Sequence, residues 1–269
     1  MLTIVISVQV FSQQHAQLSL EDIYQDHIFR TNTVQGLRWM NDGNYYTALA
    51  NSINILQYST ATGEVVDTLV RGASLMAGDT HTPIQIGSYQ FSADESKILI
   101  SSEVEKIYRR SSKAINYVYD LNSRQIDLLV DGDKQSFASF SPKGNQVAFV
   151  RDNNLYVKNL DVDTTIAITT DGQKNKIING MADWVYEEEL SLSKAFFWSP
   201  DGQKIAYLKF DETEVPLYTM QNGMVCTPKS IPLSIRRPEK KTLPSPYTST
   251  ILERVKPSKF QEVQMLIFI

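Results

Sequence analysis

Short stretches of alternating hydrophobic and polar residues follow one another along most of the chain, separated by turn-forming residues. Four of the turns share one pattern, in which an aromatic residue ends one stretch and a tight polar turn leads into the next. Such alternation is typical of β-strands, and the turn residues between the stretches predict β-hairpins. The four turns lie at residues 39–43, 91–95, 140–144 and 198–202.

The spacing of these turns is close to regular. Their aromatic residues are 52, 49 and 58 residues apart, and a period of about 50 residues built from short strands is typical of β-propeller blades. We therefore predict an all-β fold, a partial β-propeller of about four blades between Leu37 and Met220. An antiparallel sandwich is the alternative, because sandwiches space their strands similarly. Strands are expected within residues 97–100, 116–121, 125–132, 146–150, 155–161, 164–172 and 204–208.

The N-terminal part of the chain has a different character. Residues 18–24 predict a short helix with Ser19 at its cap. Residues 1–11 form an apolar run that is too short to span a membrane, and a candidate cleavage position follows near Ala16. We interpret residues 1–17 as a signal-peptide remnant and expect a secreted or periplasmic protein, with membrane association as an option. Because no Lys or Arg precedes Arg30, a first strand is the alternative.

Composition changes again near residue 222. Residues 226–269 hold six of the 10 prolines, no glycine, and eight Lys or Arg against three Glu. Strand alternation is lost there, so residues 223–269 are predicted to be an irregular tail. The tail is either a Pro-rich basic linker or a segment that follows a lost reading frame. The predicted organisation is thus residues 1–17, a propeller part at 18–222, and the tail.

Charge and composition exclude several kinds of function. The net charge of −4 gives the chain no general attraction to nucleic acid or anionic lipid. Cys226 is the only cysteine, so no disulfide can form within the chain. No Gly-rich phosphate loop, paired-histidine motif or EF-hand loop is present. We therefore expect no cofactor and no metal.

Three consecutive carboxylates stand out in the sequence Asp-Trp-Val-Tyr-Glu-Glu-Glu-Leu at residues 183–190. Neighbouring like charges repel, so a fold that buries part of this run needs a cation beside it. A solvated acidic turn is one interpretation. Trp184 and Tyr186 favour another, because large aromatic side chains pack on apolar surface and would draw the carboxylates toward a wall.

This acidic run and the segments at residues 198–202 and 210–217 resemble, in the same order, the dipeptidyl peptidase IV family of serine exopeptidases. The resemblance implies that Glu188 and Glu189 bind the free α-ammonium of a peptide. Charge-assisted hydrogen bonds from that group would let the pair recognise where the substrate chain begins.

Residues 108–122 resemble the family segment whose arginine holds a substrate carbonyl group, which implies that role for Arg109. The neighbouring Arg110 leaves open which arginine points inward. A guanidinium near the two glutamates would keep both carboxylates charged and offer a fork of donors. Without the resemblance, a solvated turn cation is the alternative.

The family's catalytic triad lies in a C-terminal α/β-hydrolase domain, and its propeller has eight blades. This chain has no Gly-x-Ser-x-Gly sequence, and its histidines, His15, His27 and His81, are interpreted as ordinary surface residues. No catalytic residue is therefore assigned, and the chain alone is expected to be inactive.

The expected function is to supply N-terminus recognition to a peptidase that removes Xaa-Pro or Xaa-Ala dipeptides. The expected partners are the substrate N-terminus and the missing hydrolase domain, and the sequence leaves open whether the whole protein is a homodimer. The alternative function is a non-catalytic propeller that serves as a binding module.

Overall fold

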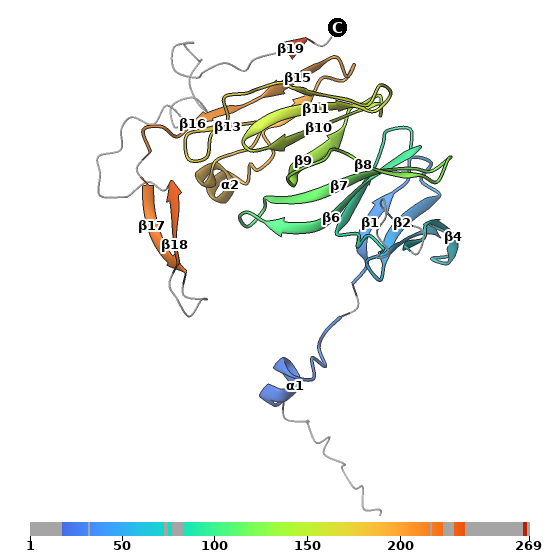
Figure 1. The fold of residues 1–269 in the computed structure, drawn as a ribbon. Helices are drawn as coiled ribbons and strands as arrows, with labels where there is room; N and C mark the ends of the chain where they lie inside the picture. The colour runs from blue at the N-terminus through green and yellow to red at the C-terminus, as the bar shows by residue number, and fades with distance from the viewer. Residues whose placement is uncertain are drawn as a thin grey trace, which may run out of the picture. The chain divides into compact units, whose positions relative to one another are not determined.

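The computed structural model describes residues 18–31, 33–72, 75–76 and 83–215, together with the backbone of three strands near the C-terminus (Figure 1). The chain forms two units, Met1–Val34 and Gln35–Ile269, which are described separately. The predicted signal remnant at residues 1–17 lies outside the described residues.

The first unit contains the predicted short helix, α1 (Leu20–Tyr24). Ser19 caps it: its side-chain oxygen accepts the Asp22 N–H at 3.0 Å, and the Asp22 carboxylate accepts the Ser19 N–H at 2.8 Å. This reciprocal pair satisfies two backbone donors that a helix start would leave free. The prediction of a helix with Ser19 at its cap is confirmed.

The second unit is built mainly from β-strands in successive antiparallel repeats. The first repeat comprises β1 (Gln35–Trp39), β2 (Tyr45–Ala50), β3 (Asn54–Ser59) and β4 (Val65–Val70). The second comprises β5 (Ser88–Phe91), β6 (Lys97–Lys106), β7 (Ser112–Asp120) and β8 (Ile126–Leu128). The third comprises β9 (Gln135–Phe140), β10 (Gln146–Arg151), β11 (Asn154–Asn159) and β12 (Thr164–Ala167).

A further repeat begins with β14 (Phe196–Trp198) and β15 (Lys204–Tyr207). Between the third repeat and β14 lie β13 (Ile177–Asn179) and the helix α2 (Trp184–Leu190); β16 (Lys209–Asp211) pairs with β13. The four aromatic-led turns each join two hairpin strands, namely β1–β2, β5–β6, β9–β10 and β14–β15, as predicted. The hairpin prediction is therefore confirmed.

The middle strand β6 buries successive side chains on opposite faces. Ile98 and Ile100 pack into a core cluster with Ile55 of the first repeat. Leu99, which lies between them, packs into a second cluster with Phe149 of the third repeat. Successive strand residues point to opposite faces, so the second repeat is covered on both sides by its neighbours in the chain.

The same arrangement recurs at β10. Val147 and Phe149 belong to the cluster shared with the second repeat, whereas Ala148 and Val150 pack with Phe196 of the fourth. In a two-layer sandwich, one face of each sheet would stay in water. Burial of both faces of successive repeats instead fits propeller blades, so the predicted all-β partial propeller is confirmed and the sandwich alternative is excluded.

The second and third repeats are also joined edge to edge. Lys113 pairs with Ser136 and Ala114 with Gln135, which links β7 to β9. β6 and β7 are the longest strands of the repeats, at 10 and nine residues. The end of their hairpin therefore extends past the four-stranded repeat, and it carries Arg109.

The region after residue 222, expected to be irregular, contains two strands in its described part. β17 (Leu217–Asn222) pairs with β18 (Lys229–Ser234), and β19 (Leu266–Ile267) pairs with β15. The sequence gives this strand little signal, because Lys229–Ser234 begins with two polar residues in succession and contains Pro232. The interpretation as a natural or frame-shifted segment stays a prediction.

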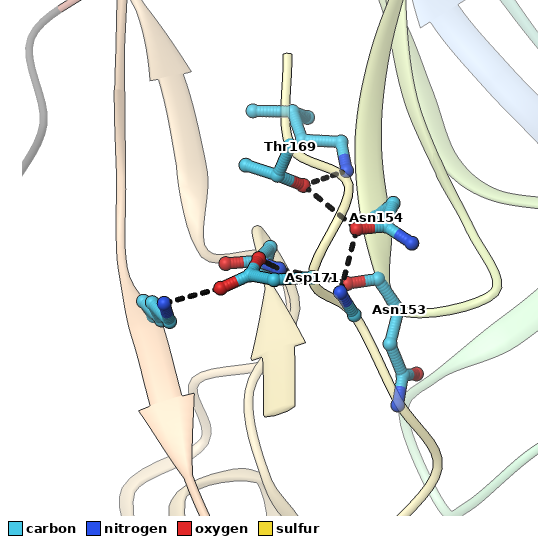
Figure 2. A network of polar contacts seen from close by, with 8 residues as sticks. Asn153, Asn154, Thr169 and Asp171 are labelled. Carbon is cyan, nitrogen blue, oxygen red and sulfur yellow. Dashed lines mark hydrogen bonds and ion pairs between the residues drawn. The ribbon is translucent and has the colours of Figure 1, made fainter. Parts of the chain in front are cut away.

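A network of side-chain amides holds the chain where it leaves the third repeat (Figure 2). The Asn154 Oδ1 accepts the Thr169 hydroxyl at 3.1 Å and the Gly172 N–H at 2.8 Å. A Cβ on Gly172 would lie 2.4 Å from the Asn153 carbonyl oxygen, so only glycine fits this close approach without backbone movement. The segment that leads toward α2 is thus fixed against β11.

Asp171 extends the same network to β13 and β16 (Figure 2). Its carboxylate accepts the Asn179 side-chain N–H at 2.9 Å and forms an ion pair with Lys209. The contact with Lys209 is the main cause that lowers the pKa of Asp171 below its usual value. These contacts position the strand pair that precedes and follows α2.

Neither helix in the described part of the chain has the length and apolar character needed to cross a lipid bilayer.

Candidate substrate-binding site

The acidic run forms a helix, α2, rather than the turn that the sequence also allowed. Asp183 precedes the helix in an extended conformation and accepts the Tyr186 N–H at 2.8 Å, which caps the first turn. The helix ends at Ser191, which adopts a left-handed conformation with φ 59° and ψ 21°. With only seven residues between its cap and its left-handed end, α2 is too short for a helical period to show in the sequence.

Tyr186 anchors α2 to the propeller. Its ring packs edge-on against Phe210 of β16, with 5.1 Å between ring centroids. The same cluster contains Ile178 and Ala195, which flank the helix in the chain. The expectation that an aromatic residue draws the carboxylates against a wall is confirmed for Tyr186.

The three glutamates of α2 have different environments. Helix geometry turns each residue by about 100° from the one before it. Glu187 is fully buried at 0% exposure, the Glu188 side chain is 16% exposed, and Glu189 is exposed. Among the described residues, none forms a hydrogen bond or ion pair with the Glu189 carboxylate.

The buried carboxylate of Glu187 holds a loop from another repeat. Residues 107–111, hereafter the arginine loop, connect β6 to β7. The Glu187 Oε1 accepts the Arg110 N–H at 2.6 Å and the Ser111 N–H at 2.8 Å. The two bonds span 77 and 76 residues of sequence, and a single side-chain oxygen makes both.

The arginine loop brings Arg109 to α2. The Arg109 Nε lies 2.8 Å from the Glu188 Oε2 in an ion pair, while 74% of the Arg109 side chain stays exposed. Arg110 contacts the helix through its backbone N–H, and its side chain lies at the surface. Of the two arginines, Arg109 is therefore the one whose guanidinium meets the acidic helix.

Typical magnitudes indicate which contact fixes the loop. An ion pair whose cation stays largely in water, as that of Arg109 with Glu188 does, is worth about 0.2–1 kcal/mol. A hydrogen bond to a charged group contributes about 1.5–3 kcal/mol. The buried carboxylate of Glu187 accepts two such bonds from the loop. The position of the loop is thus set mainly by Glu187, and the ion pair orients a guanidinium already brought close.

Two further titratable groups belong to this region: Tyr108, within the arginine loop, and Glu212, whose charge acts on Tyr108. Burial raises the pKa of Tyr108, and the negative charges of Glu212, Glu187 and Asp183 raise it further. Burial also raises the pKa of Glu212 to about 7, with a smaller contribution from Asp183. Several carboxylates therefore lie close to Tyr108, and no sequence pattern pointed to Glu212 because its burial depends on the tertiary fold.

Glu212→Gln should remove a pH-dependent loss of stability. The folded-state pKa of Glu212, about 7, lies above its usual value of 4.5, so its protonated form stabilises the fold. This contribution is fully present below about pH 4.5 and is lost as the pH rises through about 7. Relative to the variant, the wild type should lose roughly 1–3 kcal/mol of unfolding free energy between about pH 4.5 and about pH 8, measured by urea denaturation.

The exposed Glu214, two residues further along, provides the matched control. Glu214→Gln should leave the pH dependence of the unfolding free energy as it is in the wild type. A constant difference between wild type and Glu212→Gln across this pH range would contradict the prediction.

Of the three histidines and Cys226, only His27 is among the described residues. His27 is exposed at the surface, and its Nδ1 lies 3.2 Å from the Ile23 carbonyl oxygen; His15, His81 and Cys226 lie outside the described residues. Within the part of the chain that the structure describes, no group of three or more His, Cys, Asp or Glu side chains is arranged to hold a metal ion.

Comparison with known proteins identifies this arrangement. Residues 92–246, more than half of the chain, match the sequence model of the family described as dipeptidyl peptidase IV (DPP IV) N-terminal region. The chain belongs to this family. The match includes the arginine loop and α2, and it continues past residue 222, where the sequence analysis placed the end of the propeller part.

The chain is also similar in sequence to individual proteins with peptidase names. The chain is 36% identical over 184 residues to "Dipeptidyl peptidase 4" of Felis catus, which covers 67% of the chain and 23% of that protein. It is 32% identical over 184 residues to "Prolyl endopeptidase FAP" of Homo sapiens, covering 66% of the chain and 23% of that protein. The matched part of the chain therefore spans about a quarter of the length of these relatives.

A solved dipeptidyl peptidase IV structure also matches. The crystal structure of Porphyromonas gingivalis dipeptidyl peptidase 4 superposes with a TM-score of 0.74 and 34% sequence identity, over 82% of this chain and 31% of that one. At this similarity the fold of the dipeptidyl peptidase IV N-terminal region is shared, and the resemblance drawn from the motifs is confirmed.

Proposed function

We propose that the chain recognises the free N-terminus of a peptide on behalf of a dipeptidyl peptidase IV-like serine peptidase. In this proposal Glu188 and Glu189 accept hydrogen bonds from the α-ammonium, and Arg109 donates to a carbonyl group of the peptide. The observation that carries it is the ion pair between the Arg109 guanidinium and Glu188, which places a largely exposed cation beside one carboxylate of the adjacent pair.

The chemistry of these groups suits the start of a peptide. A guanidinium has five N–H donors, and Arg109 approaches Glu188 through its Nε. Among the described residues no other group is paired with the Arg109 guanidinium, so its terminal N–H groups can serve a carbonyl oxygen. An α-ammonium carries three donors and a positive charge, which complements two carboxylates through charge-assisted hydrogen bonds. A peptide whose amine is blocked can supply neither the charge nor the three donors.

The proposed reaction is removal of Xaa-Pro or Xaa-Ala dipeptides from peptide N-termini. Holding the α-ammonium at a fixed point would set the distance from the start of the chain to the bond that is cut. The catalytic serine, base and acid would come from a hydrolase domain, as the family membership and the lengths of the relatives suggest. We further propose that the whole protein acts in a secreted or periplasmic setting.

A pair of matched peptides tests the recognition step on the 269-residue chain. Ala-Pro-Ala-Ala and its N-acetylated form differ only in the charged amine, and binding would be measured by titration calorimetry. The free peptide should bind at least about tenfold more tightly, because acetylation removes hydrogen bonds to charged groups. Equal affinity for the two peptides would refute the proposal.

A further inference from the structure

Glu187 is the one carboxylate of the run that the proposed function leaves unused. Its side chain is fully buried, so it cannot touch a peptide that enters from solvent. A buried carboxylate is costly unless hydrogen-bond donors or a cation compensate its charge. No ion pair of Glu187 is present among the described residues, so the compensation comes from hydrogen bonds.

Both of those hydrogen bonds come from the arginine loop. The Glu187 Oε1 accepts the N–H groups of Arg110 and Ser111, the two residues that follow Arg109 directly. At the other end of the loop the Ile107 N–H donates to the Ser111 carbonyl oxygen at 3.1 Å, which closes the turn. The backbone on the C-terminal side of Arg109 is thus fixed to α2.

Two further polar atoms are buried where the arginine loop meets α2. The Glu187 Oε2 and the Ser111 hydroxyl are buried, and neither has a hydrogen-bond partner in the described part of the chain. Glu187 therefore makes no described polar contact other than the one that ties Arg109's loop to the helix of Glu188 and Glu189.

We infer that Glu187 is a positioning residue: it holds the arginine loop against α2 so that the Arg109 guanidinium stands beside Glu188, the neighbour of Glu189 in the helix. The inference rests on the proposed function, in which those three side chains bind the peptide. The consecutive glutamates then divide into one that faces inward and arranges the site and two that face the ligand.

The test compares Glu187→Leu, which keeps the size of the side chain without an acceptor, with Glu187→Gln, which keeps an acceptor oxygen without the charge. Hydrogen exchange of the Arg110 and Ser111 amides, followed by NMR, reports the anchoring of the loop. In Glu187→Leu exchange should rise about tenfold or more, because each amide loses a bond to a charged group. Glu187→Gln should retain most of the protection. Protected amides in β6 and β7 show that each variant is folded.

Affinity for Ala-Pro-Ala-Ala separates positioning from a merely structural role. Glu187→Leu should weaken binding about tenfold, in line with a displaced Arg109. In an Arg109→Ala background the same change should have little further effect, since two residues that act through one contact are not additive. The control Glu105→Gln removes an exposed ion pair with Lys113 in the same hairpin and should change neither measurement.

Three results would overturn the inference: unprotected Arg110 and Ser111 amides in the wild type, unchanged exchange in Glu187→Leu, or fully additive losses of affinity with Arg109→Ala. The first needs no variant, so it decides the matter even where Glu187→Leu does not fold. A wild-type chain that binds free and acetylated peptides equally would overturn the proposed function instead. The exchange measurement would still decide whether Glu187 holds the loop.

Discussion

Glu188→Gln combined with Glu189→Gln should weaken binding of a free-amine peptide about a hundredfold. Each carboxylate is expected to contribute one hydrogen bond to a charged donor, worth about 1.5–3 kcal/mol, and tenfold in affinity corresponds to about 1.4 kcal/mol. The N-acetylated peptide lacks the ammonium and should bind the variant and the wild type alike. Titration calorimetry with the two peptides measures both affinities on the same protein.

A charge-matched control separates recognition from a general loss of negative charge. Glu103 and Glu105 are exposed acids of the β6–β7 hairpin, with 62% and 55% of their side chains accessible. Replacing both with glutamine changes the net charge by the same amount and should leave peptide affinity within about twofold, because exposed charges beyond direct contact are screened by salt. A double α2 variant that binds the free peptide like the wild type would remove the proposed role of Glu188 and Glu189.

The sequence was most informative where structure is local. At residues 140–144 and 198–202 an aromatic residue followed by a Pro- and Gly-containing turn predicted a hairpin, and both hairpins are present. The turn chemistry is contained within about five residues, so no knowledge of the fold is needed. Ser19 is similar, because its capping partner Asp22 is three residues away.

The site depends on contacts that no local pattern contains. Glu187, Glu188 and Glu189 are identical in type and adjacent, yet only Glu187 is fully buried. Its hydrogen-bond partners lie 77 and 76 positions earlier in the chain, so no local pattern distinguishes it from the other two. The same separation in the chain explains why the sequence left open which of Arg109 and Arg110 points toward the glutamates. The resemblance to the family pointed to Glu188, Glu189 and Arg109, but the inward role of Glu187 required the structure.

Phe149→Ala should lower the unfolding free energy of the second unit by about 3–5 kcal/mol. Phe149 is fully buried between the second and third repeats, beside Leu99, and its ring stacks on Tyr156 with centroids 5.5 Å apart. Removing the ring leaves a cavity where two blades meet, so packing is lost on both sides. Urea denaturation followed by circular dichroism would show a lower unfolding midpoint.

Phe197 provides the matched control, since it is an aromatic strand residue of the same type but 58% exposed. Phe197→Ala should change the unfolding free energy by less than about 0.5 kcal/mol. Where Phe149→Ala does not fold, Phe149→Leu fills more of the cavity and should show a smaller loss in the same direction. Adjacent residues of β6 and of β10 pack into different core clusters, one on each face of the blade. We therefore expect the side chains packed between the blades to supply most of their stability. Equal effects of the Phe149 and Phe197 substitutions would show instead that the strand ladders alone hold the repeats together.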